Sequence, residues 1–120
     1  MIKPEYVFKE ILSGVRGNVG TVQSVVWTIP SDLPYFDGHF PQNPIFPAIG
    51  IVDASTSLLS QFTGRPDLYL KSIPMAKFLS PITPGQTVRI EWSPEGETEW
   101  LVEWKELSSA RALATLRLYA

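Results

Sequence analysis

The chain has 120 residues, a formal net charge of −2, one histidine and no cysteine. This length predicts a single domain covering residues 1–120. The lack of cysteine excludes disulfides, thiolate metal sites and a cysteine nucleophile, and one histidine cannot build a His-rich zinc site, so we expect no metal. Net negative charge argues against nucleic acid as the partner. Without a signal peptide or an apolar run of roughly 18 residues, we expect a cytoplasmic protein with no membrane span.

The N-terminal third predicts a short helix, a strand and a long stiff loop. Residues 4–13 open with Pro4 and place apolar side chains on one side, which is typical of an amphipathic helix. Residues 19–29 are rich in β-branched and aromatic residues and predict a strand. Five prolines then exclude regular structure between residues 30 and 47, and loops of this length are often functional. These prolines are Pro30, Pro34, Pro41, Pro44 and Pro47.

The rest of the chain predicts one buried helix followed by strands. Residues 48–62 contain no proline and little charge, and Gly64 supplies a C-terminal cap. Strands are predicted at 68–78, 87–93, 98–106 and 110–119, with Pro74 marking a bulge or a sheet edge. Alternation puts one set of side chains on a buried face: Val88, Ile90, Trp92, Trp100, Val102, Trp104, Ala112, Ala114, Leu116 and Leu118. Such strands with short turns predict an antiparallel sheet beside the helix, which is an α+β architecture.

Two residues stand out for chemistry. His39 lies in the proline-rich loop, and Asp53 follows fourteen positions later within the apolar helix. An imidazole titrates near neutral pH and suits a general base, while a carboxyl group on a buried helix is costly unless it is paired or protonated. Structural explanations remain open. His39 follows Asp37-Gly38 and could be a simple turn residue, and Asp53 could be the N-cap of a helix that begins at Ala54.

The segment GHFPQNPIFPAIGIVDA, residues 38–54, resembles the active-site signature of the 3-hydroxyacyl-[acyl-carrier-protein] dehydratases. That signature runs G-H-F-P-x-x-P and continues into an apolar helix with an acid fourteen residues after the histidine. The later segment AKFLSPITPGQTV, residues 76–88, is similar to a second motif of this family. An aspartate at the acid position resembles the 3-hydroxydecanoyl and aryl-polyene-cluster branches. The resemblance implies a hot-dog fold, in which a curved antiparallel sheet wraps around one central apolar helix.

The same resemblance implies a reaction and its residues. The enzyme would convert a 3-hydroxyacyl thioester into the trans-2-enoyl thioester in fatty-acid or polyene-type lipid biosynthesis, without a cofactor. His39 would act as the base and Asp53 as the acid or water-positioning group. Phe40, Pro47 and the helix start at Ala48 and Ile49 would contact the substrate. Free amides at the helix start suit the thioester oxygen.

Two departures from the family pattern concern substrate contacts. Ala48 stands where the family usually has glycine, so its methyl group could crowd the thioester. Ser57 stands where many members have glutamine, which puts in doubt a hydrogen bond to the acid one turn earlier. These departures leave open a non-catalytic acyl-binding protein. A hot-dog thioesterase is a further alternative, although that branch usually lacks the His-Phe-Pro signature.

The expected partners are an acyl carrier protein and a second copy of the chain. By the resemblance, His39 and Asp53 of one site come from different subunits of a homodimer or higher oligomer, and the acyl chain occupies a tunnel at their interface. Unpaired edge strands also favour a dimer. Because carrier proteins are acidic, docking needs a local basic patch. The candidates are Lys77, Lys71, on the same predicted strand at an even offset, and Arg65.

Overall fold

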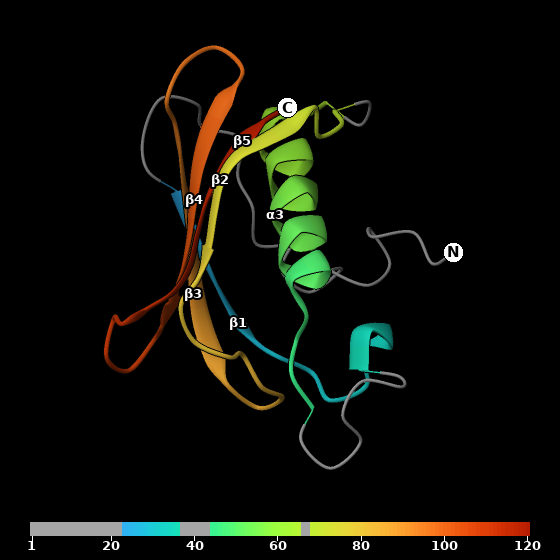
Figure 1. Cartoon of the computed structure of the whole chain (residues 1–120), viewed down its shortest axis with the longest axis vertical. Coiled ribbons are helices and arrows are strands. Elements are labelled where there is room, and N and C mark those ends of the chain that lie inside the picture. Colours follow the sequence, from blue (N-terminus) through green and yellow to red (C-terminus); the bar gives the residue numbers. More distant parts are fainter. Residues whose placement is uncertain (1–22, 37–43, 66–67) are drawn as a thin grey trace.

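The structure is a computed structural model that describes residues 23–36, 44–65 and 68–120. Within these ranges a long helix lies against one face of a five-stranded sheet (Figure 1), which confirms the α+β architecture. The helix expected at residues 4–13 and the start of the strand expected at 19–29 lie outside the described residues. The elements are β1 (Gln23–Thr28), the 3-10 turn η1 (Pro34–Phe36), α3 (Ala48–Thr63), β2 (Ser72–Phe78), β3 (Thr87–Pro94), β4 (Glu99–Glu106) and β5 (Ala112–Tyr119).

The strand order of the sheet is β1-β3-β4-β5-β2, and every neighbouring pair is antiparallel. Strands β3, β4 and β5 form a meander, whereas the two strands that flank α3 in the sequence occupy the two edges. The edge strand β2 has a register irregularity between Ser72 and Met75, as expected around Pro74. Nearly all of β2 is exposed on both faces. Among the described strands none pairs with the outer side of β2, so this edge can pair with another chain.

The helix begins and ends where the sequence predicts. Pro47 has an extended backbone and precedes the first turn, and its carbonyl accepts hydrogen bonds from the amides of Gly50 and Ile51. At the other end Gly64 adopts a left-handed conformation with φ 70° and donates to the Gln61 carbonyl, which closes the helix. Because α3 starts at Ala48, the interpretation of Asp53 as an N-cap is wrong. No helix in the described ranges is long and apolar enough to cross a membrane.

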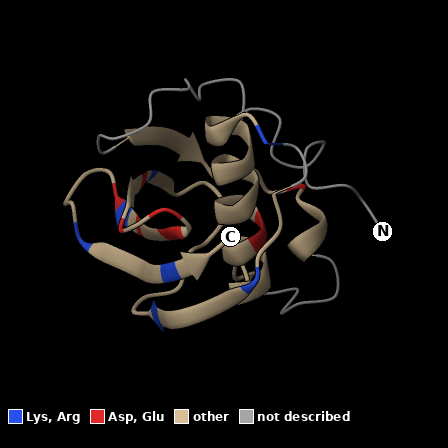
Figure 2. Cartoon of the chain, turned by 90° about the horizontal axis from the view of Figure 1, so that it is seen from above, with Lys and Arg blue, Asp and Glu red and all other residues tan. Residues whose placement is uncertain are grey.

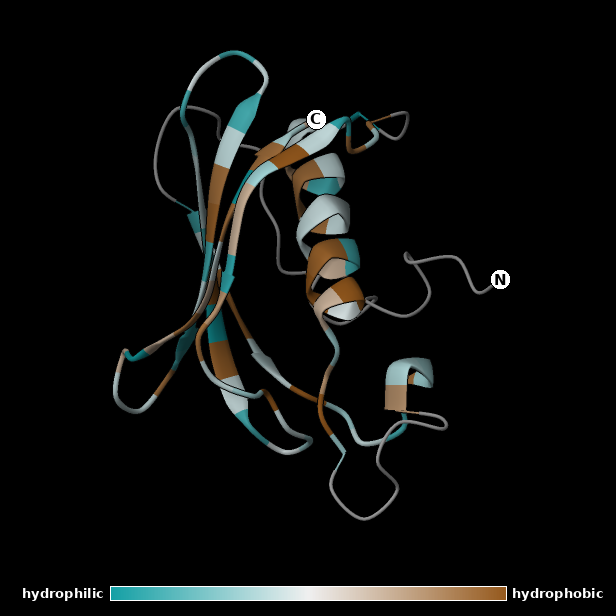
Figure 3. Cartoon of the chain, viewed as in Figure 1, coloured by the Kyte–Doolittle hydropathy of each residue, from teal (hydrophilic) through white to brown (hydrophobic). Residues whose placement is uncertain are grey.

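The core lies between α3 and the face of the sheet that the helix covers, and hydrophobic residues are frequent along both the helix and the strands (Figure 3). The inward faces predicted for β3 and β4 are confirmed, since Val88, Ile90, Trp92, Trp100, Val102 and Trp104 are all buried. One polar group is fixed within this layer. The indole Nε1 of Trp104 donates to Ser55 Oγ at 3.0 Å, and Ser55 donates to the Ile51 carbonyl at 2.7 Å. This chain of bonds ties α3 to the centre of the sheet.

The alternation predicted for the last strand fails at its beginning. Leu113 and Ala114 are both buried, whereas Ala112 is only half-buried. The pairing of β4 with β5 shifts between Trp104 and Lys105, so an extra residue is inserted in β5 at this point. The Leu113 carbonyl accepts a hydrogen bond from the Leu79 amide at 2.9 Å. The bulge therefore connects β5 to the segment that follows β2.

Candidate active site

The two expected catalytic residues differ in what the structure describes. His39 and Phe40 fall in residues 37–43, outside the described ranges. The described chain ends before this gap at Phe36, whose ring lies 6.1 Å from the ring of Phe46. It resumes at Pro44, two residues before Phe46. Both described ends of the segment that contains His39 are thus anchored beside Phe46, just ahead of the start of α3.

Asp53 lies in the second turn of α3 and is half-buried. The hydroxyl of Tyr35 donates a hydrogen bond of 2.6 Å to its Oδ2 atom. Among the described residues, no other hydrogen bond to the Asp53 carboxyl group is present. Burial, and then the bond to Asp53, raise the pKa of Tyr35 well above its ordinary value of 10, so its hydroxyl keeps its proton and remains a donor.

Aromatic packing holds Tyr35 in this place. Its ring meets the ring of Phe46 edge to face, with centroids 5.5 Å apart. Phe46 is buried and packs in turn against Trp27 and Trp104, at 5.9 and 6.1 Å. The Phe46 ring also fills the space beside Gly50, where an added Cβ would lie 2.7 Å from ring atoms. The position of the tyrosine hydroxyl is therefore set by the core.

Three of the predicted site residues share one face of the helix. Ile49, Asp53 and Ser57 are spaced four residues apart, so they lie above one another along α3. Ile49 is 59% exposed, and the other two are half-buried. The partner of the acid here is Tyr35 rather than Ser57. Many family members have glutamine at the position of Ser57, where it could donate to the acid. In this chain Tyr35 supplies the hydrogen bond instead.

The other predicted contacts lie on a different side of the helix start. Pro47 and Ala48 line a cleft of about 330 Å³, together with Ile45, Phe46, Ile51 and residues 78–82. Nearly all of these are apolar, and the volume is in the range of small-molecule sites. Asp53 is absent from the lining. Asp53 follows Ile51, a lining residue, by two positions, and two positions correspond to a rotation of about 200° around the helix axis. The carboxyl group and the cleft therefore lie on different sides of α3.

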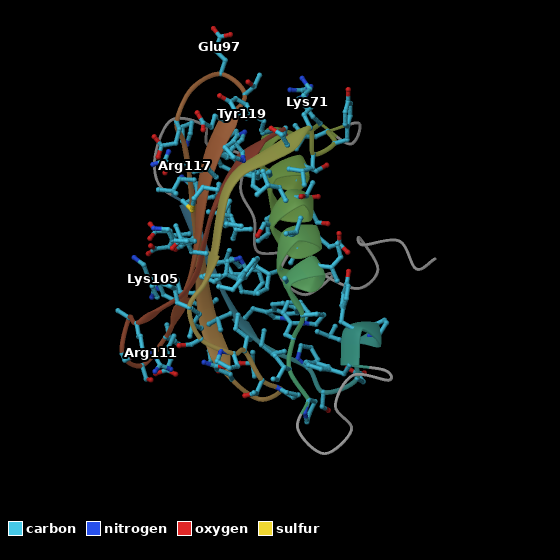
Figure 4. The ribbon with its side chains drawn as sticks, in the orientation of Figure 1. Lys71, Glu97, Lys105, Arg111, Arg117 and Tyr119 are labelled. Carbon is cyan, nitrogen blue, oxygen red and sulfur yellow. The ribbon has the colours of Figure 1, made fainter. Side chains whose placement is uncertain are left out.

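The predicted basic residues do not form one patch. Lys77 is exposed on β2 beside Phe78, which lines the cleft. Lys71 precedes β2 instead of lying within it, and the irregularity between Ser72 and Met75 breaks the even spacing that would have put both lysines on one face. Figure 4 shows Lys71 beyond the C-terminal end of α3, near which Arg65 follows the cap. The structure therefore does not put Lys71 and Lys77 on one face of β2, and the docking role of the three residues stays a prediction.

Charge is sparse along the helix itself. Asp53 is the only charged residue in α3, and Figure 2 shows most Lys, Arg, Asp and Glu residues on the strands and turns. A single carboxyl group in an apolar helix is typical of a functional position, because its desolvation is compensated only by specific partners.

Tyr35 is the functional candidate that the sequence did not reveal. It is separated from Asp53 by eighteen residues and lies in a proline-rich segment with no periodic pattern. The available signal was indirect. A tyrosine placed among buried aromatic residues needs a partner for its hydroxyl group, and the nearby acid could have been considered.

A family model described as ApeI-like, ApeI dehydratase, matches residues 18–115. The 3-hydroxyacyl-[acyl-carrier-protein] dehydratase FabZ of Brucella melitensis is 48% identical over 59 residues. This alignment covers 43% of the chain and 38% of the relative, so the chain spans less than half the length of the curated relatives it matches. The identity is high but local.

Two solved structures have a similar fold. The dehydratase heterocomplex ApeI:P from Xenorhabdus doucetiae matches with a TM-score of 0.68 and 22% identity, over 82% of this chain and 85% of that one. An uncharacterised protein from Erwinia carotovora subsp. atroseptica matches with a TM-score of 0.69 and 22% identity, over 82% and 81%. These likenesses concern the fold alone, and they confirm the hot-dog arrangement.

Proposed function

The chain belongs to the ApeI-like dehydratase family, and we propose that it removes water from a 3-hydroxyacyl thioester carried by an acyl carrier protein. The observation that supports this most directly is the single carboxyl group of Asp53, held by a hydrogen bond from Tyr35 near the start of an apolar helix. A reaction that eliminates water next to a thioester needs such a group to protonate the departing hydroxyl. The product is the trans-2-enoyl thioester.

In the proposed reaction His39 takes the proton from C2 of the substrate. The electrons of that C–H bond form the C2–C3 double bond, and the C3–O bond breaks. The departing hydroxyl receives a proton from Asp53 and leaves as water. A proton then passes through solvent from His39 to Asp53, which restores both groups. Negative charge that develops on the thioester oxygen suits the first amides of α3, at Ala48 and Ile49, which lack acceptors within the helix.

The apolar cleft supports an acyl substrate. Its lining combines the helix start with residues 78–82 at the end of β2. Two of the lining residues, Phe78 and Leu79, leave large apolar surfaces exposed, at 47% and 56%. Apolar surface of this extent is typical of a site that is completed by another molecule. We propose that the acyl chain follows this cleft, with Ala48 nearest the thioester and Phe40 among the contacts.

We propose that the cleft is closed by a second hot-dog chain that pairs along β2. The open edge and exposed apolar residues of β2 support this arrangement. A homodimer is the form expected from the sequence. The similar structure from Xenorhabdus doucetiae is a heterocomplex, so a related but different partner is the alternative. Mixing the inactive variants His39→Ala and Asp53→Asn should restore activity if each site uses two chains. If activity does not return after proven subunit exchange, the shared site is wrong.

Docking of the carrier protein is proposed at Lys77. Its neighbour Phe78 lines the cleft, whereas Lys71 and Arg65 lie toward the other end of α3. Lys77→Glu should raise KM for the carrier-linked substrate and leave a short thioester without carrier unaffected. An equal loss on both substrates would place Lys77 in the fold or the tunnel. A cytoplasmic location and a role in fatty-acid or polyene-type lipid synthesis belong to the same proposal, and cell fractionation tests the location.

The experiment that tests the function uses purified protein and enoyl thioesters of increasing chain length. A dehydratase also catalyses the reverse hydration, so the ultraviolet absorbance of the conjugated enoyl group should fall to an equilibrium value without release of free thiol. Thiol release would identify a thioesterase instead. Binding without either change would support the non-catalytic alternative.

A further inference from the structure

The contact between Tyr35 and Asp53 has a chemical consequence for the proposed reaction. The tyrosine donates to one carboxyl oxygen, Oδ2, at 2.6 Å. The other oxygen, Oδ1, makes no hydrogen bond to the residues that the structure describes, and it is the oxygen that we assign to the substrate. A carboxyl group with one oxygen fixed has its remaining oxygen aimed in a defined direction.

We propose that Tyr35 is a positioning residue that holds the Asp53 carboxyl group in one orientation. The proposal rests on the proposed dehydration and names a residue that serves its acid. A carboxyl group with one oxygen held by a donor presents its other oxygen in a fixed direction, so the proton of Asp53 reaches the departing hydroxyl along a defined path. The proton that returns from His39 then restores the carboxylic acid of Asp53 for the next cycle. Tyr35 exchanges no proton in this scheme.

The surroundings of Tyr35 fit this role better than a purely structural one. Its ring is already anchored edge to face on Phe46, so the hydroxyl is not needed to hold the ring in the core. Its pKa is raised by burial and by Asp53, which keeps the donor protonated. Tyr35 also lies four residues before His39 in the chain. A hydroxyl anchored in this way fixes the direction of the Asp53 carboxyl group.

The first test needs no substrate and asks whether the pair exists in solution. Tyrosine ionisation is followed by ultraviolet absorbance as the pH is raised. Wild type and Tyr35→Phe should give coincident curves through the range in which ordinary tyrosines ionise, around pH 10, because Tyr35 contributes nothing there. Asp53→Asn removes the charge of Asp53 but not the burial, so the pKa of Tyr35 should fall below its wild-type value while staying above the ordinary one. If Tyr35→Phe removes an ordinary tyrosine from the curve, the pairing is wrong.

The second test concerns the reaction. Tyr35→Phe should lower kcat by roughly tenfold to hundredfold, the factor for one hydrogen bond to a charged group, with little change in KM. Without its donor the carboxyl group can rotate away from the departing hydroxyl, so the loss should fall on kcat rather than on KM, and the melting temperature should stay near that of wild type. Tyr119→Phe is the matched control, since Figure 4 shows Tyr119 at the opposite end of the molecule from η1.

The outcomes separate the two proposals. If wild type shows no dehydration with any chain length, the proposed function fails, and the ionisation curves still decide whether Tyr35 holds Asp53. If wild type is active and Tyr35→Phe keeps its kcat, the positioning role is wrong. A loss of kcat that is accompanied by an equally large rise in KM and a lower melting temperature would make Tyr35 structural only, which also overturns the proposal.

Discussion

At the scale of single residues, the pairing of Tyr35 with Asp53 is the central feature of the site. Local sequence patterns identify Asp53, because a lone acid interrupts an apolar helix, but they cannot identify Tyr35. Its contact closes a loop of eighteen residues and depends on where Phe46 places the ring. Long-range contacts of this kind are fixed by tertiary packing, and neither propensity nor alternation contains that information.

The raised pKa of Tyr35 predicts a stability change at alkaline pH. Below pH 10 the phenol is neutral in the folded and the unfolded protein, so its contribution is fully present. As the pH rises above 10 the unfolded chain ionises first, and this contribution is lost progressively toward the folded-state pKa. The difference in free energy of unfolding between wild type and Tyr35→Phe should therefore shrink with rising pH, measured by urea unfolding. A difference that stays constant through this range would contradict the assignment.

At the scale of elements, the helix was predictable and the details of the sheet were less so. Pro47 and Gly64 mark the ends of α3 through effects confined to neighbouring residues, so the predicted 48–62 agrees with Ala48–Thr63. Alternation likewise gives the buried faces of β3 and β4. The sequence did not predict the inserted residue at Leu113, because a bulge depends on the register with the neighbouring strand. The cleft could not be predicted either, because it forms between the helix start and residues 78–82, which are distant in the sequence.

The packing of α3 against Phe46 predicts a specific effect of Gly50→Ala. The new Cβ would meet the buried Phe46 ring at 2.7 Å, so the ring must move. We expect a loss of about 1–3 kcal/mol in the free energy of unfolding, the usual cost of overpacking a core. Because Tyr35 rests on the same ring, kcat should fall as well. Gln61→Gly, at an exposed position of the same helix, is a control for helix stability outside the core. Equal kcat losses in both variants would argue against this route to the site.

At the scale of the whole molecule, one chain leaves a sheet edge and an apolar cleft open. Ile73 on β2 is 40% exposed, and Leu107, after β4, is exposed to the same extent. We expect Ile73→Asp to shift the protein toward monomer, because it places a charge in the proposed interface. Leu107→Asp is the matched control and should leave the mass unchanged. Light scattering at micromolar concentration measures both. A wild-type monomer would contradict the proposed assembly.

Asp53 is the acid of the proposed dehydration, and the hydration of an enoyl thioester by Asp53→Asn tests this role most directly. Asparagine keeps an oxygen that accepts the Tyr35 hydrogen bond, so the variant should fold with wild-type stability while its rate falls by roughly 10² to 10⁴. Asp32→Asn, at an exposed position outside the site, is the control and should keep full activity. The account predicts a folded, inactive Asp53→Asn beside an active Asp32→Asn. Near-wild-type turnover by a folded Asp53→Asn would contradict it.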